Sequence, residues 1–257
     1  MGEMGALPTV IAVGAMKCGT SAIHAYLDAH PQIAMTPLKE VNYFFGPDEA
    51  PGSDPDRWWR QGQWHRGASW YASLFEASAP IRGESSPGYT SPSAPEAAAR
   101  MAALVPGVRL VYLVRDPVAR ALAQWRHHVR DGTEARPLAE ALLDESSQYV
   151  ARGRYAERIA PFLRSFPREQ LHVVVQERLD RQRRCELAAL YAHVGADPGH
   201  WDAGLAERRH VGGRAVADDV PLSLRRAFWD RTRDDVDALR ELLADELPEW
   251  RDPATPC

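Results

Sequence analysis

The stretch that decides the fold is Thr9–Ala29, TVIAVGAMKCGTSAIHAYLDA. Its first part, Thr9–Val13, is a short apolar run that predicts a buried strand, and its last part, Thr20–Ala29, has the apolar spacing of an amphipathic helix. The loop between them, Gly14–Gly19, begins and ends with glycine. The sequence therefore predicts a strand, a glycine-bounded loop and a helix in direct succession.

The same succession occurs twice more along the chain. Arg109–Val114 is a continuous apolar strand that a proline-containing turn separates from the helical Val118–Arg130, and the strand Leu171–Val175 precedes the helical Arg183–Val194. Strands without alternation of apolar and polar residues, each followed by a helix, imply a parallel sheet covered on both faces. The predicted fold is therefore α/β, a P-loop-like three-layer sandwich with a central parallel sheet flanked by helices.

Outside these units, four further stretches have helical patterns. They are Ala94–Leu104, Leu138–Val150, Tyr155–Phe166 and Leu222–Leu243. We expect residues 1–257 to form a single domain, because no repeat, low-complexity tract or linker divides them. Residues 47–70 differ in being rich in Pro, Gly, Asp and Trp, so we expect a Trp-rich excursion from the sheet there.

Composition narrows the classes of function. A net charge of −4 does not indicate a nucleic-acid-binding protein. No run approaches the ~18 apolar residues of a membrane span, and no basic leader precedes the first strand. The three cysteines, Cys18, Cys185 and Cys257, have no disulfide or zinc-ligand spacing. We expect a soluble cytoplasmic protein with reduced thiols and no metal site, and the oligomeric state is left open.

The glycine-bounded loop is a candidate anion site. Gly14–Ser21, GAMKCGTS, has the glycine spacing of a Walker A loop, with its lysine moved to the middle. Backbone N–H groups of such a loop and of the helix start converge on an anion, and the hydroxyls of Thr20 and Ser21 add donors. Lys17 is placed to neutralise charge on a leaving oxygen, whereas Cys18 is interpreted as a small filler. The alternative is an ordinary turn with a solvated lysine.

A candidate base follows the first helix. Leu38–Phe45, LKEVNYFF, places Glu40 among apolar neighbours, which raise the pKa of a carboxylate and make it a better proton acceptor. Lys39 is one of only two lysines among 31 basic residues and could neutralise charge or contact an acceptor. The alternative for Glu40 is a charged residue at a strand edge. His24 and His30 compete for the role of base, although structural roles are expected for both.

Together these segments carry a resemblance. Pro8–Phe45 resembles the opening of the sulfotransferases that use 3′-phosphoadenylyl sulfate, particularly the carbohydrate branch with the heparan sulfate enzymes and its bacterial relatives. The resemblance implies that Glu40 is the general base. The residues implied to hold the 5′-phosphosulfate are Lys17, Cys18, Gly19, Thr20 and Ser21. Weaker similarity continues to about Trp250.

The segment Val111–Trp125 resembles the family's second signature, in which an arginine and a serine eight residues later bind the nucleotide 3′-phosphate. Arg115 matches the arginine, whose guanidinium suits bidentate phosphate binding. An ion pair between Arg115 and Asp116 or another acid is the alternative. Ala123 stands at the position of the serine and has no hydroxyl. Backbone amides or Arg120 are the available substitutes, although we also expect Arg120 to face solvent or brace its helix.

Three further segments supply candidate contacts. His210–Arg214, HVGGR, is similar to the glycine-basic loop with which the family closes over the 3′-phosphate, which implicates Arg214. Arg82–Tyr89, RGESSPGY, is similar to a segment that lines the acceptor pocket. The acceptor contacts implied or expected are Glu84, Ser86, Trp70, Lys39 and His128. Trp70 could equally anchor the Trp-rich excursion, and satisfied or exposed histidines are commoner than ligand-binding ones.

The hypothesis is an in-line transfer of the sulfuryl group from 3′-phosphoadenylyl sulfate, as co-substrate, to a hydroxyl or amine of a small-molecule or carbohydrate acceptor. No metal is demanded, because the transferred group carries a single negative charge. One alternative is a P-loop kinase that transfers phosphate from ATP, with Asp116 holding magnesium. Another is a nucleotide-binding module without catalysis. The identity of the acceptor is left open.

Overall fold

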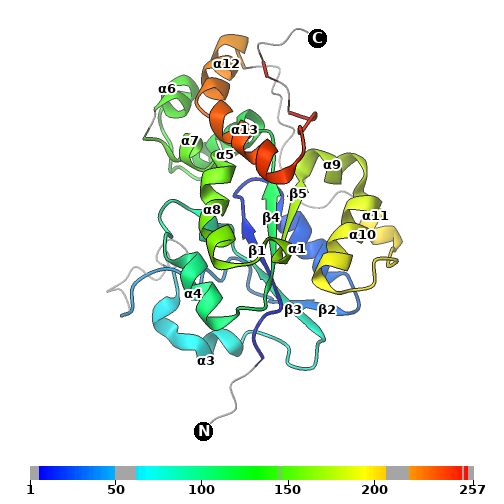
Figure 1. Ribbon diagram of the computed structural model, residues 1–257. Helices are drawn as coiled ribbons and strands as arrows, with labels where there is room; N and C mark the ends of the chain where they lie inside the picture. Colours follow the sequence, from blue (N-terminus) through cyan, green and yellow to red (C-terminus); the bar gives the residue numbers. More distant parts are fainter. Residues whose placement is uncertain (1–5, 50–61, 145, 207–219, 251, 254–257) are drawn as a thin grey trace.

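The computed structural model describes residues 6–49, 62–144, 146–206, 220–250 and 252–253. Among these residues, five strands form one sheet in the order β2-β3-β1-β4-β5, and every pair of neighbours is parallel (Figure 1). The strands are β1 Val10–Gly14, β2 Ile33–Met35, β3 Ile81–Ser85, β4 Arg109–Val114 and β5 Leu171–Val175. The predicted α/β fold with a central parallel sheet is confirmed.

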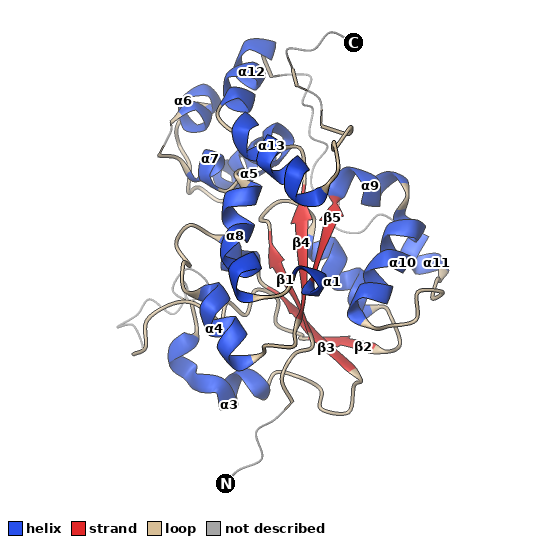
Figure 2. Ribbon diagram, viewed as in Figure 1, coloured by secondary structure: helices blue, strands red, loops and turns tan. Residues whose placement is uncertain are grey.

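The sheet is flanked by helices on both sides (Figure 2). Those up to β5 are α1 Thr20–Asp28, α3 Gly67–Ala72, α4 Ala97–Leu104, α5 Pro117–Arg130, α6 Leu138–Leu143, α7 Gln148–Ala151 and α8 Tyr155–Ser165. Those after it are α9 Gln176–Arg181, α10 Arg183–Val194, α11 Ala203–Ala206, α12 Leu222–Asp230 and α13 Arg233–Leu243. Short 3-10 turns are Trp64–Arg66, Pro87–Thr90 and Arg168–Gln170. Helix α1 packs along β2 and β3, α10 packs on β5, and α4 and α13 pack on α8.

The middle of the sheet is its most apolar part. Every residue of β1 is buried, and so is β4 from Leu110 onward, because helices cover both faces. Sequence patterns missed β2 and β3. Strand β2 has only three residues, and β3 carries the charged Arg82 and Glu84, so neither has the apolar run that marks β1.

Two of the predicted helices, Leu138–Val150 and Leu222–Leu243, are each divided into two shorter helices. Between α6 and α7, the side chain of Asp144 accepts the backbone N–H of Ser146 at 2.9 Å. Between α12 and α13, the buried Thr232 donates its hydroxyl to the carbonyl of Trp229 at 3.2 Å. Such side-chain-to-backbone bonds offer the chain an alternative to helix continuation. No helix among the described residues is long and apolar enough to cross a bilayer.

The order of the strands positions the site. From β1 the chain proceeds to β2 and β3 on one side of the sheet, and from β4 it proceeds to β5 on the other. The carboxyl ends of β1 and β4 therefore flank the point where the strand order reverses, which is where such sheets bind ligands. The glycine-bounded loop and Arg115 both lie there, and the N–H of Ala15 bonds the carbonyl of Leu113 at 2.8 Å.

Candidate active site

The loop between β1 and α1 requires glycine at both ends. Gly14 has φ +155°, and a Cβ there would stand 2.1 Å from Oγ1 of Thr90. Gly19 precedes the first residue of α1 with φ +95°, and a Cβ there would stand 2.0 Å from Oε1 of Gln176. The loop therefore lies closely against two neighbouring segments, and the positive φ at both positions would strain any residue with a side chain.

The N-terminus of α1 is an open set of hydrogen-bond donors. No side chain of the described residues caps the helix, and its first intrahelical bonds run from the amides of Ala22 and Ile23 to the carbonyl of Gly19. Within the described part of the chain, the amides of Gly19, Thr20 and Ser21 have no acceptor. These free N–H groups and the positive end of the helix dipole favour an anion at this place.

Cys18 supports the loop from beneath. Its side chain is fully buried, with Sγ 3.5 Å from the hydroxyl oxygen of Tyr155, and burial raises the pKa of the thiol to about 11. Its amide donates to the carbonyl of Ala15 at 3.2 Å. Cys18 therefore shapes the loop, and its amide is less available to an anion than those at the start of α1.

Two lysines and Glu40 gather beside the loop. Nζ of Lys39 lies 3.5 Å from Oε1 of Glu40 and also donates to Oγ of Ser21. Burial lowers the pKa of Lys17, and the nearby carboxylate of Glu40 opposes that shift. The expectation that Glu40 lies in apolar surroundings is wrong. Its side chain is 42% exposed, because the apolar residues that follow it in sequence point into the core.

The backbone of Glu40 is held against the edge of the sheet. Glu40 has φ +60°, and its N–H donates to the carbonyl of Ser85 at 3.0 Å. Upstream, the N–H of Thr36 donates to the carbonyl of Gly83 at 2.8 Å. The left-handed conformation, uncommon for a residue with a side chain, is thereby fixed by contacts with β3.

A buried carboxylate lies behind this segment. Glu84 is completely buried and accepts hydroxyl hydrogens from Tyr71 at 2.8 Å, from Tyr89 and from Ser86. Burial raises its pKa, and the three hydrogen bonds oppose that shift. The hydroxyl-rich surroundings explain how a charged residue is accommodated on a central strand.

The hydroxyls around Glu84 also hold the segment that follows Glu40. The oxygen of Tyr89 accepts the N–H of Tyr43 at 2.9 Å, and Oγ of Ser86 accepts the N–H of Asn42 at 3.0 Å. Both Glu84 and Ser86 are fully buried, so neither presents a polar atom to an acceptor. The expectation that these two residues contact the acceptor directly is therefore wrong. Instead they help to hold the segment that follows Glu40 in place.

A cavity of about 400 Å³ opens beside Glu40. Its polar lining includes Glu40, Asn42, Ser91, His128, Thr133 and Arg152. Of the expected acceptor contacts, His128 lines this cavity and Lys39 adjoins it through Glu40. Trp70 is not among the described lining residues. Its ring packs under the guanidinium of Arg66, 3.9 Å from the ring centroid, as expected of an anchoring residue.

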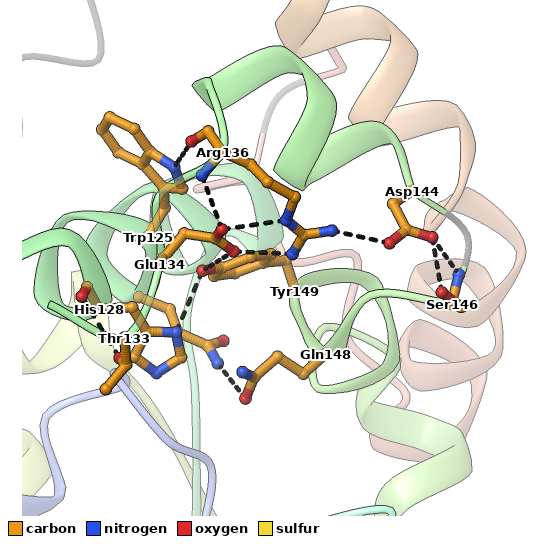
Figure 3. Close-up of polar contacts among 10 residues, drawn as sticks. Trp125, His128, Thr133, Glu134, Arg136, Asp144, Ser146, Gln148 and Tyr149 are labelled. Carbon is orange, nitrogen blue, oxygen red and sulfur yellow. Dashed lines mark hydrogen bonds and ion pairs between the residues drawn. The ribbon is translucent and has the colours of Figure 1, made fainter.

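His128 belongs to a chain of polar contacts that Figure 3 shows. Its Nδ1 lies 3.1 Å from the hydroxyl of Tyr149, which donates to Oε2 of Glu134 at 3.0 Å. Arg136 binds Glu134 through two nitrogens, at 3.0 and 2.7 Å, and reaches Asp144 at 2.9 Å. The cavity wall is therefore braced by an ion-pair network outside it.

This network sets the tautomer of His128. Hydrogen bonds from Arg136 hold the pKa of Glu134 at about 2, so its carboxylate only accepts and the hydroxyl of Tyr149 must donate to it. The oxygen of Tyr149 then accepts from Nδ1–H of His128. Burial and the neighbouring His127 lower the pKa of His128 to about 4, so the ring is neutral near pH 7. Its Nε2 is consequently a hydrogen-bond acceptor.

Arg115 follows β4 directly and lies beside the glycine-bounded loop. Its Nη1 is 3.5 Å from the carbonyl of Lys17, and no carboxylate among the described residues pairs with it. Asp116 instead caps α5, with Oδ1 accepting the N–H of Ala119 at 2.7 Å. The alternative of an Arg115–Asp116 ion pair is thus wrong.

Arg120 cannot stand in for the hydroxyl that Ala123 lacks. It is fully buried, donates to Oε1 of Gln124 at 2.6 Å and also donates to the carbonyl of Tyr149. It braces α5, and the expectation that it faces solvent or substitutes at the 3′-phosphate is wrong. Arg214, the other candidate for that phosphate, lies outside the described residues.

Sequence reasoning missed Arg152 as a lining residue of the cavity. The chain has arginines at 152, 154 and 158, and no local pattern separates one from the others. Arg152 lines the cavity, whereas the side chain of Arg154 is 45% exposed and that of Arg158 pairs with Glu157. Only the path of the chain between α7 and α8 distinguishes them.

Comparison with known proteins gives a match of residues 8–202 to a family model described as "Sulfotransferase family". Heparan sulfate glucosamine 3-O-sulfotransferase 3B1 of Mus musculus is 29% identical over 199 residues, covering 74% of this chain and 46% of that protein. Bifunctional heparan sulfate N-deacetylase/N-sulfotransferase 1 of Caenorhabditis elegans is 28% identical over 190 residues, covering 67% and 20%. The chain spans less than half the length of these relatives.

A solved structure matches over nearly the whole of both chains. A sulfotransferase from Alicyclobacillus acidocaldarius has a TM-score of 0.80 and 27% identity, covering 96% of this chain and 99% of that chain. The sulfotransferase domain of the Synechococcus PCC 7002 olefin synthase, at a TM-score of 0.58 and 17% identity, shares the fold. The likeness therefore extends well beyond the N-terminal loop.

Proposed function

Because the chain belongs to the sulfotransferase family, we propose that it transfers a sulfuryl group from 3′-phosphoadenylyl sulfate to a hydroxyl or amine of a small-molecule or carbohydrate acceptor. One observation carries this proposal. The uncapped N-terminus of α1, the partly buried Lys17 and the accessible carboxylate of Glu40 meet where a cavity opens. An anion site and a proton acceptor thus adjoin one another.

In this proposal 3′-phosphoadenylyl sulfate binds at the carboxyl ends of β1 and β4. The amides of Gly19, Thr20 and Ser21 bind the 5′-phosphosulfate together with Lys17, and the guanidinium of Arg115 binds the 3′-phosphate. Support comes from the free amides of the first helical turn and from the lack of a carboxylate partner for Arg115 among the described residues. Arg214 remains a predicted second contact to the 3′-phosphate.

The transfer is an in-line displacement at sulfur. Glu40 takes the proton of the acceptor hydroxyl or amine as its oxygen or nitrogen attacks sulfur. The bond from sulfur to the 5′-phosphate oxygen breaks, and 3′-phosphoadenosine 5′-phosphate leaves with the electron pair. Lys17 and the loop amides neutralise the charge that grows on the leaving oxygen, so positioning and electrostatic stabilisation supply most of the catalysis.

The carbohydrate option is supported by the names of the relatives, which are heparan sulfate sulfotransferases. Hydroxyl and amide side chains in the cavity lining, such as Ser91, Thr133 and Asn42, suit an acceptor rich in hydroxyl groups. A cytoplasmic location is also proposed. It is supported by the free thiols of Cys18 and Cys185.

A P-loop kinase is the nearest rival. In that reading Asp116 would hold magnesium, but its carboxylate is committed to capping α5. Sulfate transfer that continues in excess chelator would support metal-independent chemistry. Phosphate transfer from ATP, with no use of 3′-phosphoadenylyl sulfate, would overturn the proposal.

The decisive experiment uses Glu40→Gln with sulfur-labelled donor and a panel of glycosides, phenols and amines. We expect transfer to fall by about 10²- to 10⁴-fold, while calorimetry shows 3′-phosphoadenosine 5′-phosphate bound as in the parent protein. Glu76→Gln, a change at an exposed carboxylate, is the matched control and should retain transfer. A Glu40→Gln protein with full activity would contradict the assignment of the base. Nucleotide binding without any transfer by the parent protein would favour the non-catalytic module.

A further inference from the structure

The cavity contains an arginine without an acidic partner. Arg152 follows α7, and its Nη2 donates to Oγ of Ser91 at 3.0 Å. Its Nε is buried and has no acceptor among the residues that the structure describes. No carboxylate of those residues lies within ion-pair distance of its guanidinium.

Two other partly buried arginines, Arg178 and Arg136, are paired with acids. Arg178 bonds both Asp245, at 2.8 Å, and Glu249, at 2.8 Å. Arg136 has Glu134 and Asp144 in the same way. At these two positions carboxylates satisfy the guanidinium, whereas the described partner of Arg152 is a neutral hydroxyl.

The electrostatic surroundings of Arg152 make its isolation costly. Burial lowers its pKa to about 10, and the positive charges of Arg120 and Arg158 act in the same direction. Glu40 opposes them, but it lies beyond ion-pair distance and is already paired with Lys39. A partly buried charge whose partner among the described residues is one neutral hydroxyl destabilises the unliganded protein, and an incoming anion would relieve that cost.

We propose that Arg152 binds an oxyanion of the acceptor, so that the acceptor carries a carboxylate or phosphate besides the hydroxyl or amine that is sulfated. This inference rests on the proposed function, because Glu40, which lines the same cavity, marks where the reacting group lies. Among the described lining residues no other side chain is an arginine or a lysine, so Arg152 is the residue that selects charge. It is a specificity-determining residue for the acceptor.

The test measures binding directly and needs no turnover. Protein saturated with 3′-phosphoadenosine 5′-phosphate is titrated at constant ionic strength with methyl β-D-glucoside, its 6-phosphate and methyl β-D-glucuronide. The Nε–H signal of Arg152 in a ¹H–¹⁵N spectrum, identified by its loss in Arg152→Gln, reports on the guanidinium. We expect at least one of the two anions to shift it and to bind about tenfold more tightly than the neutral glycoside. The arm that responds distinguishes carboxylate from phosphate.

Variants separate charge from structure. Arg152→Gln should lose the preference for the anion about tenfold, Arg152→Lys should retain part of it, and Arg154→Gln, at an exposed arginine two residues away, should keep it. Equal binding of all three glycosides by the parent protein, or an unshifted Nε–H signal with both anions, would overturn the proposal. Loss of nucleotide binding in Arg152→Gln would assign the residue to the donor instead. A parent protein that binds no nucleotide at all would refute the proposed function and not this inference specifically.

Discussion

Glu84 and Tyr89 form a buried hydrogen bond, and the same tyrosine oxygen receives the backbone N–H of Tyr43 at 2.9 Å. A carboxylate on a central strand thereby fixes the segment that carries the candidate base. The hydroxyl of Tyr71 also donates to Glu84, at 2.8 Å, but it contacts no backbone amide of that segment. These two tyrosines allow the positioning effect to be separated from simple loss of a buried hydrogen bond.

Tyr89→Phe should therefore reduce transfer more than Tyr71→Phe does. Each change removes one hydroxyl bound to Glu84 and should lower the free energy of unfolding by about 1–2 kcal/mol. Only Tyr89→Phe also leaves the amide of Tyr43 without its acceptor. Chemical denaturation gives the stability, and kcat with labelled donor gives the effect on catalysis. Equal losses of kcat in the two variants would contradict the positioning argument.

Lys17→Ala should lower kcat by about 10²- to 10³-fold, since it removes the ammonium that the proposed mechanism places at the leaving oxygen. Lys17→Arg should recover only part of the rate, because the larger planar guanidinium does not fit the same point-charge position. Single-turnover measurements with saturating donor separate this effect from weaker nucleotide binding. A rate within about threefold of the parent protein would exclude the assigned role.

Tyr149→Phe should remove the hydrogen bond that favours the Nδ1–H tautomer of His128. The variant keeps the ring and the backbone carbonyl that Arg120 binds, but it removes the oxygen that receives Nδ1–H. The ¹⁵N shifts of the imidazole should then move from the Nδ1–H form toward the Nε2–H form at pH 7. Glu134→Gln should produce a smaller change in the same direction. Unchanged shifts in Tyr149→Phe would contradict the hydrogen-bond assignment.

The cysteines should differ sharply in reactivity. Cys18 is fully buried with a thiol pKa near 11, whereas Cys185 is exposed. In a Cys257→Ser background at pH 8, maleimide should label Cys185 within minutes and Cys18 only after denaturation. Peptide mapping by mass spectrometry identifies the sites. Rapid labelling of Cys18 in the native protein would show that the glycine-bounded loop opens and exposes this thiol.

His172 should contribute to loss of stability in acid. Burial and the neighbouring His193 lower its pKa from about 6.5 to about 4, so the unfolded chain binds the proton more tightly. Stability therefore falls as pH decreases from about 6.5 toward 4, and it is fully retained above that window. His172→Phe should flatten the dependence of the urea midpoint on pH between 7 and 5. An identical slope in the variant would argue against the burial of this imidazole.

Local sequence patterns predict the segment from β1 through α1, but they do not predict every strand of the sheet. Strand β1, the glycines of the loop and helix α1 follow from apolar spacing and backbone freedom, which neighbouring residues determine. Strand β3 does not follow, because its sequence IRGES has two charged residues, and only burial against β1 and the hydroxyl cluster make it a strand. The exposure of Glu40 likewise does not follow from local sequence. Its apolar neighbours in sequence turn into the core and leave the carboxylate accessible.

By itself, the sequence determined the glycine-bounded loop, its lysine and the position of the candidate base, because each depends on a short continuous segment. The tertiary structure alone decided which polar groups meet. Glu84 and Ser86 became buried supports, and Arg120 became a brace for its helix. Within the described part of the chain, Arg152 became a charge without a carboxylate partner, and its hydroxyl partner, Ser91, is 61 residues away. Burial and pairing depend on contacts between distant segments, and no local pattern of residues encodes those contacts.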